Sequence, residues 1–357
     1  MRDARSLVRL LADPSAAGRV KDWTSLIAVA RAESLSGSLA WRLLGQALPP
    51  RVEAVLESAR SDGEATRVQA LWEAEMARRA LAPLGIPVIL LKGTAYAAAG
   101  LDAGLGRSIG DLDILVPRPA LPDAERALLA AGWEWVKEDP YDDQYYRRYM
   151  HELPPLIHRE RDRMIDVHHS ILPLTARPKP DMEAMIEARV ALADGLFALS
   201  PTDMIVHAAA HLFADGDIAG GLRNLWDIDR LLREFGERED GFWPALRERS
   251  ERHGLVPAVS RAVRLARHLY DTPVNWCQAP ISKPLISQGA GSEKMDGRRR
   301  LSAVDALYRR RLLARDGWGR PTRPATRLGF YVRSHWLRMP PAMLARHLWV
   351  KARRPRR

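Results

Sequence analysis

The hydrophobic and polar positions of the first 84 residues repeat with the period of an α-helix. Apolar side chains recur at helical spacing at Trp23, Leu26, Ile27 and Ala30. A longer stretch, 52–84, is rich in Ala, Glu and Arg and stops at Gly85, which is typical of a helix end. The pattern therefore predicts an N-terminal helical module over residues 1–84.

From residue 85 onward the pattern changes to short apolar runs separated by glycine and by polar turns. These runs predict strands at 87–91, 111–116, 133–136, 153–158 and 164–169. A helix over 95–99 is expected after the first strand, and a helix over 119–131 after the second. Residues 85–170 are therefore predicted to form a small α/β core.

After residue 170 the helical period returns. The sequence Ser-Pro-Thr-Asp at 200–203 is a helix-start signal, with Ser as the cap and Pro at the first helical position. Helices are predicted at 201–213, 222–235, 242–252 and 257–270. We expect a second helical module over 171–278, a linker rich in Pro, Ser and Gly over 279–297, and a basic C-terminal segment over 298–357.

Charge is distributed unevenly along the 357 residues. The net charge of +11 combines +16 in residues 294–357 with −5 in the first 293 residues. Residues 328–348 mix aromatic and basic residues. Three interpretations of that stretch remain open: a packed helix with solvated charges, an anionic membrane surface contact, or a nucleic-acid contact. The basic segment and the acidic body therefore pose separate questions.

Several protein classes are excluded by composition and motif. The single cysteine, Cys277, rules out an intramolecular disulfide, and the hydrophobic content of 46% rules out a disordered chain. No run of about 18 apolar residues occurs, so no integral membrane segment is expected. Phosphate-loop kinase and dinucleotide fingerprints are absent. We expect a cytoplasmic protein, with peripheral membrane attachment left open.

Three aspartates carry the strongest chemical signal. Asp111 and Asp113 are two residues apart on a predicted strand, so both carboxylates project from one face. Asp166 lies on a later apolar strand. Carboxylates gathered on one small sheet favour a bound cation, and Mg²⁺, with Mn²⁺ as the substitute, prefers such oxygen ligands. Gly93-Thr94, between a strand and a helix, is placed to receive a phosphate group.

At these positions the chain resembles a known family. The stretches VILLKGTAYAAAG, SIGDLDILVP and MIDVHHSI are similar to the uncharacterised nucleotidyltransferase family of the DNA polymerase β-like superfamily. The resemblance implies an α+β fold in which a small mixed sheet is flanked by N- and C-terminal helical modules. It also implies an enzyme that moves an NMP from an NTP to a hydroxyl or phosphate acceptor and releases pyrophosphate.

The resemblance also implies roles for individual residues. Asp111, Asp113 and Asp166 would bind Mg²⁺ and form the catalytic site. The nucleotide would be held by Lys92, Gly93, Thr94, Arg107 and Ser108. Lys and Arg at these positions suit phosphate charge. His168 is a candidate for contact with the acceptor, which would be a sugar, a peptide or a protein. Thr94 and His169 depart from the superfamily pattern, but no carboxylate is missing.

Other interpretations compete with this one. The chain could instead transfer AMP to proteins or belong to a toxin–antitoxin pair, or it could be a non-catalytic basic module for an anionic membrane or nucleic acid. His207 and His211 share one face of a helix, but no Glu accompanies them in a protease motif, so we expect them to be structural. Asp227 and Asp229 lie on a predicted helix and are also expected to be structural.

Overall fold

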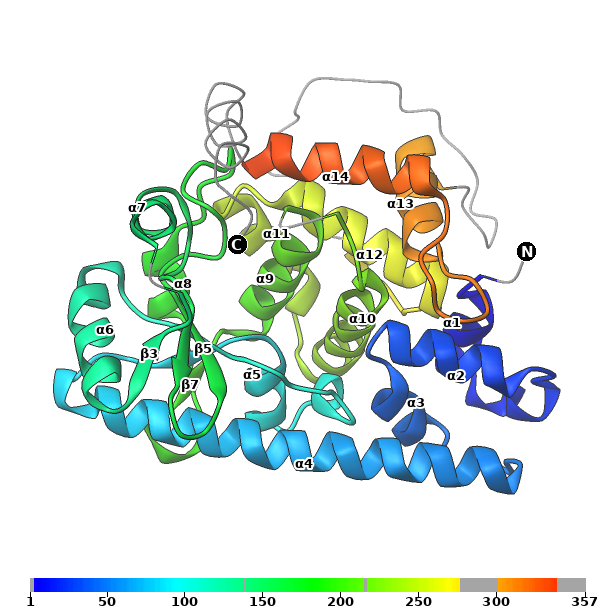
Figure 1. The fold of residues 1–357 in the computed structure, drawn as a ribbon. Helices are drawn as coiled ribbons and strands as arrows, with labels where there is room; N and C mark the ends of the chain where they lie inside the picture. Colours follow the sequence, from blue (N-terminus) through cyan, green and yellow to red (C-terminus); the bar gives the residue numbers. More distant parts are fainter. Residues whose placement is uncertain (1–2, 138, 215–216, 277–300, 339–357) are drawn as a thin grey trace, which may run out of the picture.

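A computed structural model of the protein describes residues 3–137, 139–214, 217–276 and 301–338. The chain forms a single mixed sheet with helices packed around it and a larger helical region beside it (Figure 1). The α+β fold expected from the sequence is therefore confirmed. The predicted linker over 279–297 lies outside the described residues, as does the end of the basic segment after residue 338.

The N-terminal region is helical, as its pattern predicts. Its helices are α1 (Arg5–Ala12), α2 (Trp23–Ala32), α3 (Ser36–Arg42) and α4 (Pro50–Leu81), followed by the 3₁₀ turn η2 (Ala82–Leu84). Proline at the first position of α4 suits a helix start, and Gly85 ends the segment in the left-handed conformation. Helix α4 packs along α3, α5, α6 and strand β2, and thereby connects the N-terminal helices with the sheet.

The sheet contains seven short strands in the order β3-β4-β5-β2-β1-β7-β6. They are β1 (Ile89–Leu90), β2 (Leu112–Leu115), β3 (Trp133–Trp135), β4 (Leu156–His158), β5 (Arg163–His168), β6 (Val190–Ala191) and β7 (Phe197–Ala198). Strands β2 and β5 are parallel neighbours in the centre, while β1 pairs antiparallel with β2. The two central strands are the ones that carry the aspartates.

The sheet extends past residue 170, where the predicted α/β core ended. Strand β7 pairs in parallel with β1, and β6 pairs with β7, so residues 190–198 complete one edge of the sheet. Each of these strands has only two residues, which is too short for an alternating pattern to be visible in a sequence. The sequence prediction also lacked helix α7 (Pro140–Tyr149), whose polar composition hides a helical period.

All but one of the remaining helices of the core region were predicted from the sequence; the short helix Met182–Glu187 was not. The remaining helices are α5 (Lys92–Ala98), α6 (Leu121–Ala130), α8 (Met182–Glu187), α9 (Pro201–Ala214), α10 (Gly221–Arg238), α11 (Phe242–Arg252) and α12 (Val256–Tyr270). The helix-start signal is confirmed, because Ser200 Oγ accepts a hydrogen bond from the Asp203 backbone N–H at 3.3 Å.

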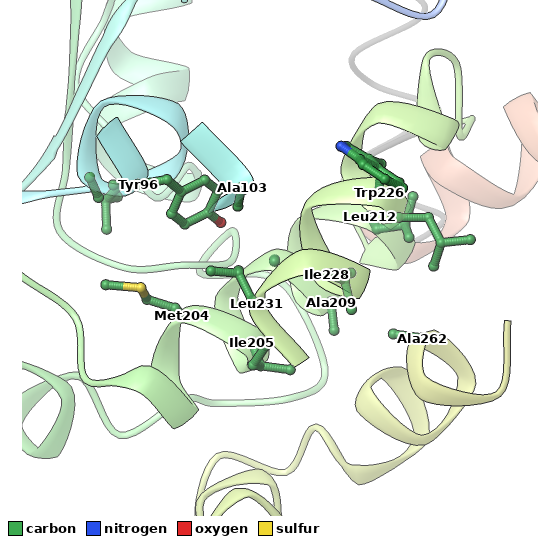
Figure 2. Close-up of a cluster of buried hydrophobic side chains, with 14 of the residues drawn as sticks. Tyr96, Ala103, Met204, Ile205, Ala209, Leu212, Trp226, Ile228, Leu231 and Ala262 are labelled. Carbon is green, nitrogen blue, oxygen red and sulfur yellow. The ribbon is translucent and has the colours of Figure 1, made fainter. Parts of the chain in front are cut away.

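Buried apolar side chains connect the sheet unit to the helical region. Figure 2 shows Tyr96 of α5 and Ala103 of η3 (Asp102–Gly104) close to side chains from α9 and α10. Tyr96 and Leu231 are both buried in this contact. Among the described residues, one hydrophobic cluster runs from Ala4 to Phe330. The predicted modules therefore share a core, and their boundaries mark changes of pattern along the chain.

The described part of the basic segment is folded onto this body. Helix α13 (Ala303–Leu312) contacts α12, and α14 (Pro324–Arg338) contacts α9. The structure therefore supports helix packing for at least the first part of the stretch that left three interpretations open. Among the described residues, no helix combines the length and the apolar character needed to cross a bilayer.

We predict that Gly106→Ala destabilises the protein by about 2–4 kcal/mol. Gly106 has a φ of 62°, and an added Cβ would overlap the backbone of Gly37, so both left-handed strain and overpacking apply. The matched control is Gly85→Ala, which has a φ of 63° but open space around the added atom, and should cost only about 1 kcal/mol. Urea unfolding measures the free energy of unfolding of both variants. Equal losses of stability would contradict the close contact between Gly106 and Gly37.

Candidate active site

The fold gathers the three predicted aspartates into one cluster. In the parallel pair of β2 and β5, Asp113 is directly opposite Asp166, so their side chains share a face of the sheet. Asp111 precedes β2 by one residue. One carboxylate oxygen from each aspartate lies within 4.8 Å of the others. Asp113 is buried, Asp166 is half-buried and Asp111 is exposed, so the cluster reaches the surface at Asp111.

Two basic side chains hold Asp113 in place. The Lys92 ammonium lies 2.7 Å from Asp113 Oδ1, and His168 Nε2 lies 3.0 Å from the same oxygen. Both contacts use Oδ1, so neither engages the second carboxylate oxygen. Lys92 adopts a left-handed φ of 47°, which is uncommon for a residue with a side chain and costs about 1 kcal/mol. This strained turn aims the ammonium at the aspartate.

A second layer, which the sequence did not reveal, lies behind His168. Glu152 forms an isolated β-bridge with His168, and its Oε2 lies 3.4 Å from His168 Nδ1. His151 Nε2 lies 3.7 Å from the same Glu152 oxygen. A chain of ionisable groups therefore runs from the aspartate cluster through His168 to Glu152. In the sequence this layer is visible only as the His-Glu pair at 151–152. Its position next to His168 is set by tertiary packing and cannot be inferred from the local pattern.

The pKa values in the cluster reflect these contacts. Burial alone would raise the pKa of Asp113, but the Lys92 ammonium and the His168 contact hold it well below its usual range. Burial would lower the pKa of His168, but Asp113 raises it above the ordinary histidine value. For Asp166, burial and the nearby charges of Asp113 and Asp111 outweigh the opposing charges of His168 and Lys92 and raise its pKa to about 6.

The donor set suits a hard divalent cation. Three carboxylates supply only oxygen ligands, one of them is exposed, and their mutual repulsion is visible in the raised pKa of Asp166. Mg²⁺ commonly takes a few carboxylates and completes its shell with water or phosphate oxygens. Asp111, Asp113 and Asp166 therefore fit Mg²⁺ or Mn²⁺. His151, Glu152 and His168 also come within 4.8 Å of one another.

The residues expected to bind nucleotide lie near the carboxylate cluster but differ in their burial and in their contacts. Gly93 is buried, and an added Cβ would overlap the Arg107 side chain, so glycine is needed for Arg107 to lie against it. Arg107 is paired with Asp227 of α10, and its guanidinium lies 5.9 Å from the centre of the Tyr96 ring. The Thr94 hydroxyl is buried and has no hydrogen-bond partner within the described part of the chain.

Asp227 therefore has a specific structural role: it positions Arg107 through a pair that joins α10 to the loop before β2. Asp229 instead contacts Arg230 and Arg233. Ser108 is exposed in the same loop as Arg107.

The predicted histidine pair lies on helix α9. His207 is buried, and burial together with the charge of Lys92 lowers its pKa well below the ordinary value, so it is neutral. His211 is half-buried one turn later. Within the described residues, the two groups of side chains able to hold a metal do not include either histidine. The geometry therefore favours a structural role for both.

Comparison with known proteins identifies a family for this chain. A protein-family model described as uncharacterised nucleotidyltransferase matches residues 19–271, which is more than half of the chain and includes the whole sheet. No curated protein matches the sequence.

We predict that Asp166→Asn stabilises the metal-free protein at pH 8. The folded-state pKa of about 6 lies above the ordinary value of 3.8. Ionised Asp166 therefore lowers the free energy of unfolding of the wild type by its full amount above pH 6, and this penalty shrinks as the pH falls toward 4 and the carboxylate is protonated. The gain in Tm should therefore be largest at pH 8 and smaller at pH 5, measured by thermal unfolding with EDTA present. Asp123→Asn, at an exposed aspartate of α6, is the control. A loss of stability at pH 8, or a gain that ignores pH, would contradict the assignment.

Proposed function

The chain belongs to the uncharacterised nucleotidyltransferase family, and from this premise we propose that it transfers an NMP from an NTP to an acceptor in a Mg²⁺-dependent reaction. The acceptor supplies a hydroxyl or phosphate oxygen, a new bond forms to the α-phosphorus, and pyrophosphate leaves. The observation that carries the proposal is the convergence of three carboxylates from two adjacent parallel strands within 4.8 Å.

Each carboxylate has a distinct place in the proposed reaction. Asp111 and Asp113 would hold the cation, and Asp166 would complete the site from the neighbouring strand. Bound Mg²⁺ supplies Lewis-acid stabilisation of the negative charge on the phosphates. Asp166 is also proposed to accept the proton of the acceptor hydroxyl on its carboxylate oxygen.

The neighbouring polar groups are suited to the triphosphate. Lys92 brings an ammonium to the edge of the carboxylate cluster, where a phosphate oxygen would share it with Asp113. The buried Thr94 hydroxyl has an unused donor within the described residues, and an unsatisfied donor gains free energy from a ligand acceptor. Arg107 and the exposed Ser108 lie in the loop that leads into β2 and are proposed to contact the nucleotide from that side.

The acceptor is proposed to be a sugar, a peptide or a protein. The exposure of Asp111 supports access by an acceptor from solvent. Transfer of AMP to a partner protein, including a toxin–antitoxin partner, uses the same carboxylates and is the second candidate function. Mn²⁺ is expected to replace Mg²⁺. A cytoplasmic location and an anionic surface as a further partner are part of the proposal.

We predict that Asp111→Asn reduces NMP transfer by about 100-fold or more, since removing a metal ligand forfeits several kcal/mol of transition-state stabilisation. Transfer of α-³²P label from each of the four NTPs to sugar, peptide and protein acceptors provides the measurement. Asp111 is exposed, so this change should leave the fold intact. Asp123→Asn is the matched control and should transfer label as the wild type does.

Thermal unfolding of the wild type and Asp111→Asn separates the proposed enzyme from a non-catalytic binding module. Thermal stabilisation by NTP with Mg²⁺ should appear in the wild type and be reduced in Asp111→Asn. If Asp111→Asn transferred label at the wild-type rate, the three aspartates would not be the catalytic site. If NTP with Mg²⁺ did not stabilise the wild type, or stabilised Asp111→Asn equally, the binding-module interpretation would replace the enzyme.

A further inference from the structure

Exposed apolar side chains are concentrated in the C-terminal part of the structure. The described residues include sixteen large hydrophobic side chains that are exposed, and seven of these lie between residues 301 and 338. They are Val304, Leu307, Trp318, Leu328, Tyr331, Val332 and Trp336. Single exposed apolar residues are common on protein surfaces, but such a concentration marks an interaction site.

The inner face of α14 is firmly packed. Phe330 is buried, and its ring lies 5.0 Å from that of Tyr308 on α13, edge to face. Arg333 donates a hydrogen bond to the Phe213 carbonyl of α9 at 2.9 Å, and Ser334 is buried beside it. The helix is therefore anchored to the body through one side. Among the described residues, the apolar side chains Leu328, Tyr331, Val332 and Trp336 of the same helix remain exposed.

The outer face of α14 carries a continuous apolar stripe. Leu328, Val332 and Trp336 are spaced four residues apart, and Tyr331 lies next to Leu328 and Val332 on the helix surface. All four side chains are more than half exposed, from 53% for Tyr331 to 63% for Leu328. The helix lies along one margin of the molecule, with α4 along the opposite margin (Figure 1). The stripe therefore faces outward.

The charge around this stripe is positive. Residues 301–338 contain nine arginines and two acidic residues. Asp305 is buried and paired with Arg264, and Asp316 accepts hydrogen bonds from backbone amides of its own loop. Arg310 and Arg327, in contrast, are exposed. The sequence from 339 to 357 adds six Lys or Arg residues and no acid. A partner for this face must accept both apolar contact and positive charge.

We propose that the outer face of α14, formed by Leu328, Tyr331, Val332 and Trp336, docks the protein onto an anionic phospholipid surface. Aliphatic and aromatic side chains on one helix face, with arginines beside them, match the chemistry of the headgroup and acyl-chain boundary. A second copy of the chain fits poorly, because a two-fold contact would bring the two arginine-rich faces together. Nucleic acid would satisfy the arginines but leave Leu328 and Val332 without an apolar partner.

The surface contains no residue of the carboxylate cluster, so the proposal does not depend on the transfer reaction. Co-sedimentation of the full-length chain with vesicles provides the test. Vesicles of phosphatidylcholine alone are compared with vesicles that also contain phosphatidylglycerol, and a duplex oligonucleotide of matched charge is tested in parallel. We expect binding to the anionic vesicles and little binding to the neutral ones.

The decisive variant is the double change Leu328→Ser with Val332→Ser. Its matched control is Leu44→Ser with Val68→Ser, at 54% and 55% exposure, which removes the same two residue types from surfaces outside α14. The α14 variant should bind vesicles about tenfold or more weakly, since each substitution removes apolar surface that would otherwise be buried in the lipid. The control should bind as the wild type does. Both variants should keep the wild-type Tm, because all four side chains are exposed.

A third variant, Arg327→Gln, tests the charge. It should weaken binding to anionic vesicles severalfold and leave the small binding to neutral vesicles unchanged. The proposal is overturned if the wild type does not bind anionic vesicles. It is also overturned if the α14 double variant binds vesicles as tightly as the Leu44→Ser, Val68→Ser control does. That result would mean that the basic charges alone attract the protein to the vesicles. Tighter binding to the oligonucleotide than to vesicles, lost in the α14 variant, would assign the face to nucleic acid instead.

Discussion

The repulsion among three carboxylates held within 4.8 Å is the constraint around which the site is built. The parallel register of β2 and β5 pairs Asp113 directly with Asp166 and so brings their carboxylates together. The fold offsets part of this charge with Lys92 and His168, both on Asp113. Lys92 and His168 compensate the charge of Asp166 only in part, so its pKa stays raised to about 6 and its ionised carboxylate lowers the stability of the fold.

The elements around the sheet serve to hold this arrangement. The strained turn at Lys92 leads directly into α5, and Gly93 leaves room for Arg107, which is fixed from the other side by Asp227 of α10. The helical region after the sheet therefore reaches back to the loop that precedes β2. Glu152 supports His168 from behind. Features distant in the sequence thus converge on two short strands, and the match to nucleotidyltransferases spans all of them.

Part of this arrangement could be predicted from the sequence, because local periodicity is visible there while tertiary contacts are not. Alternation along an apolar strand placed Asp111 and Asp113 on one face, and a helix-start signal at 200–203 located α9. Strands β6 and β7 are too short to show a period. The partnership of Arg107 with Asp227, 120 residues away, depends on tertiary packing, as does the position of Glu152. Local periodicity therefore revealed the carboxylates but not the groups that hold them.

The most direct test of the account is the position of Mn²⁺ in a crystal of the wild-type protein, located by anomalous scattering. The account predicts a Mn²⁺ peak bonded by carboxylate oxygens of Asp111, Asp113 and Asp166, because these three groups supply hard oxygen ligands close together. Mn²⁺ held by other residues, with Lys92 still paired to Asp113 and the three carboxylates free of metal, would contradict it.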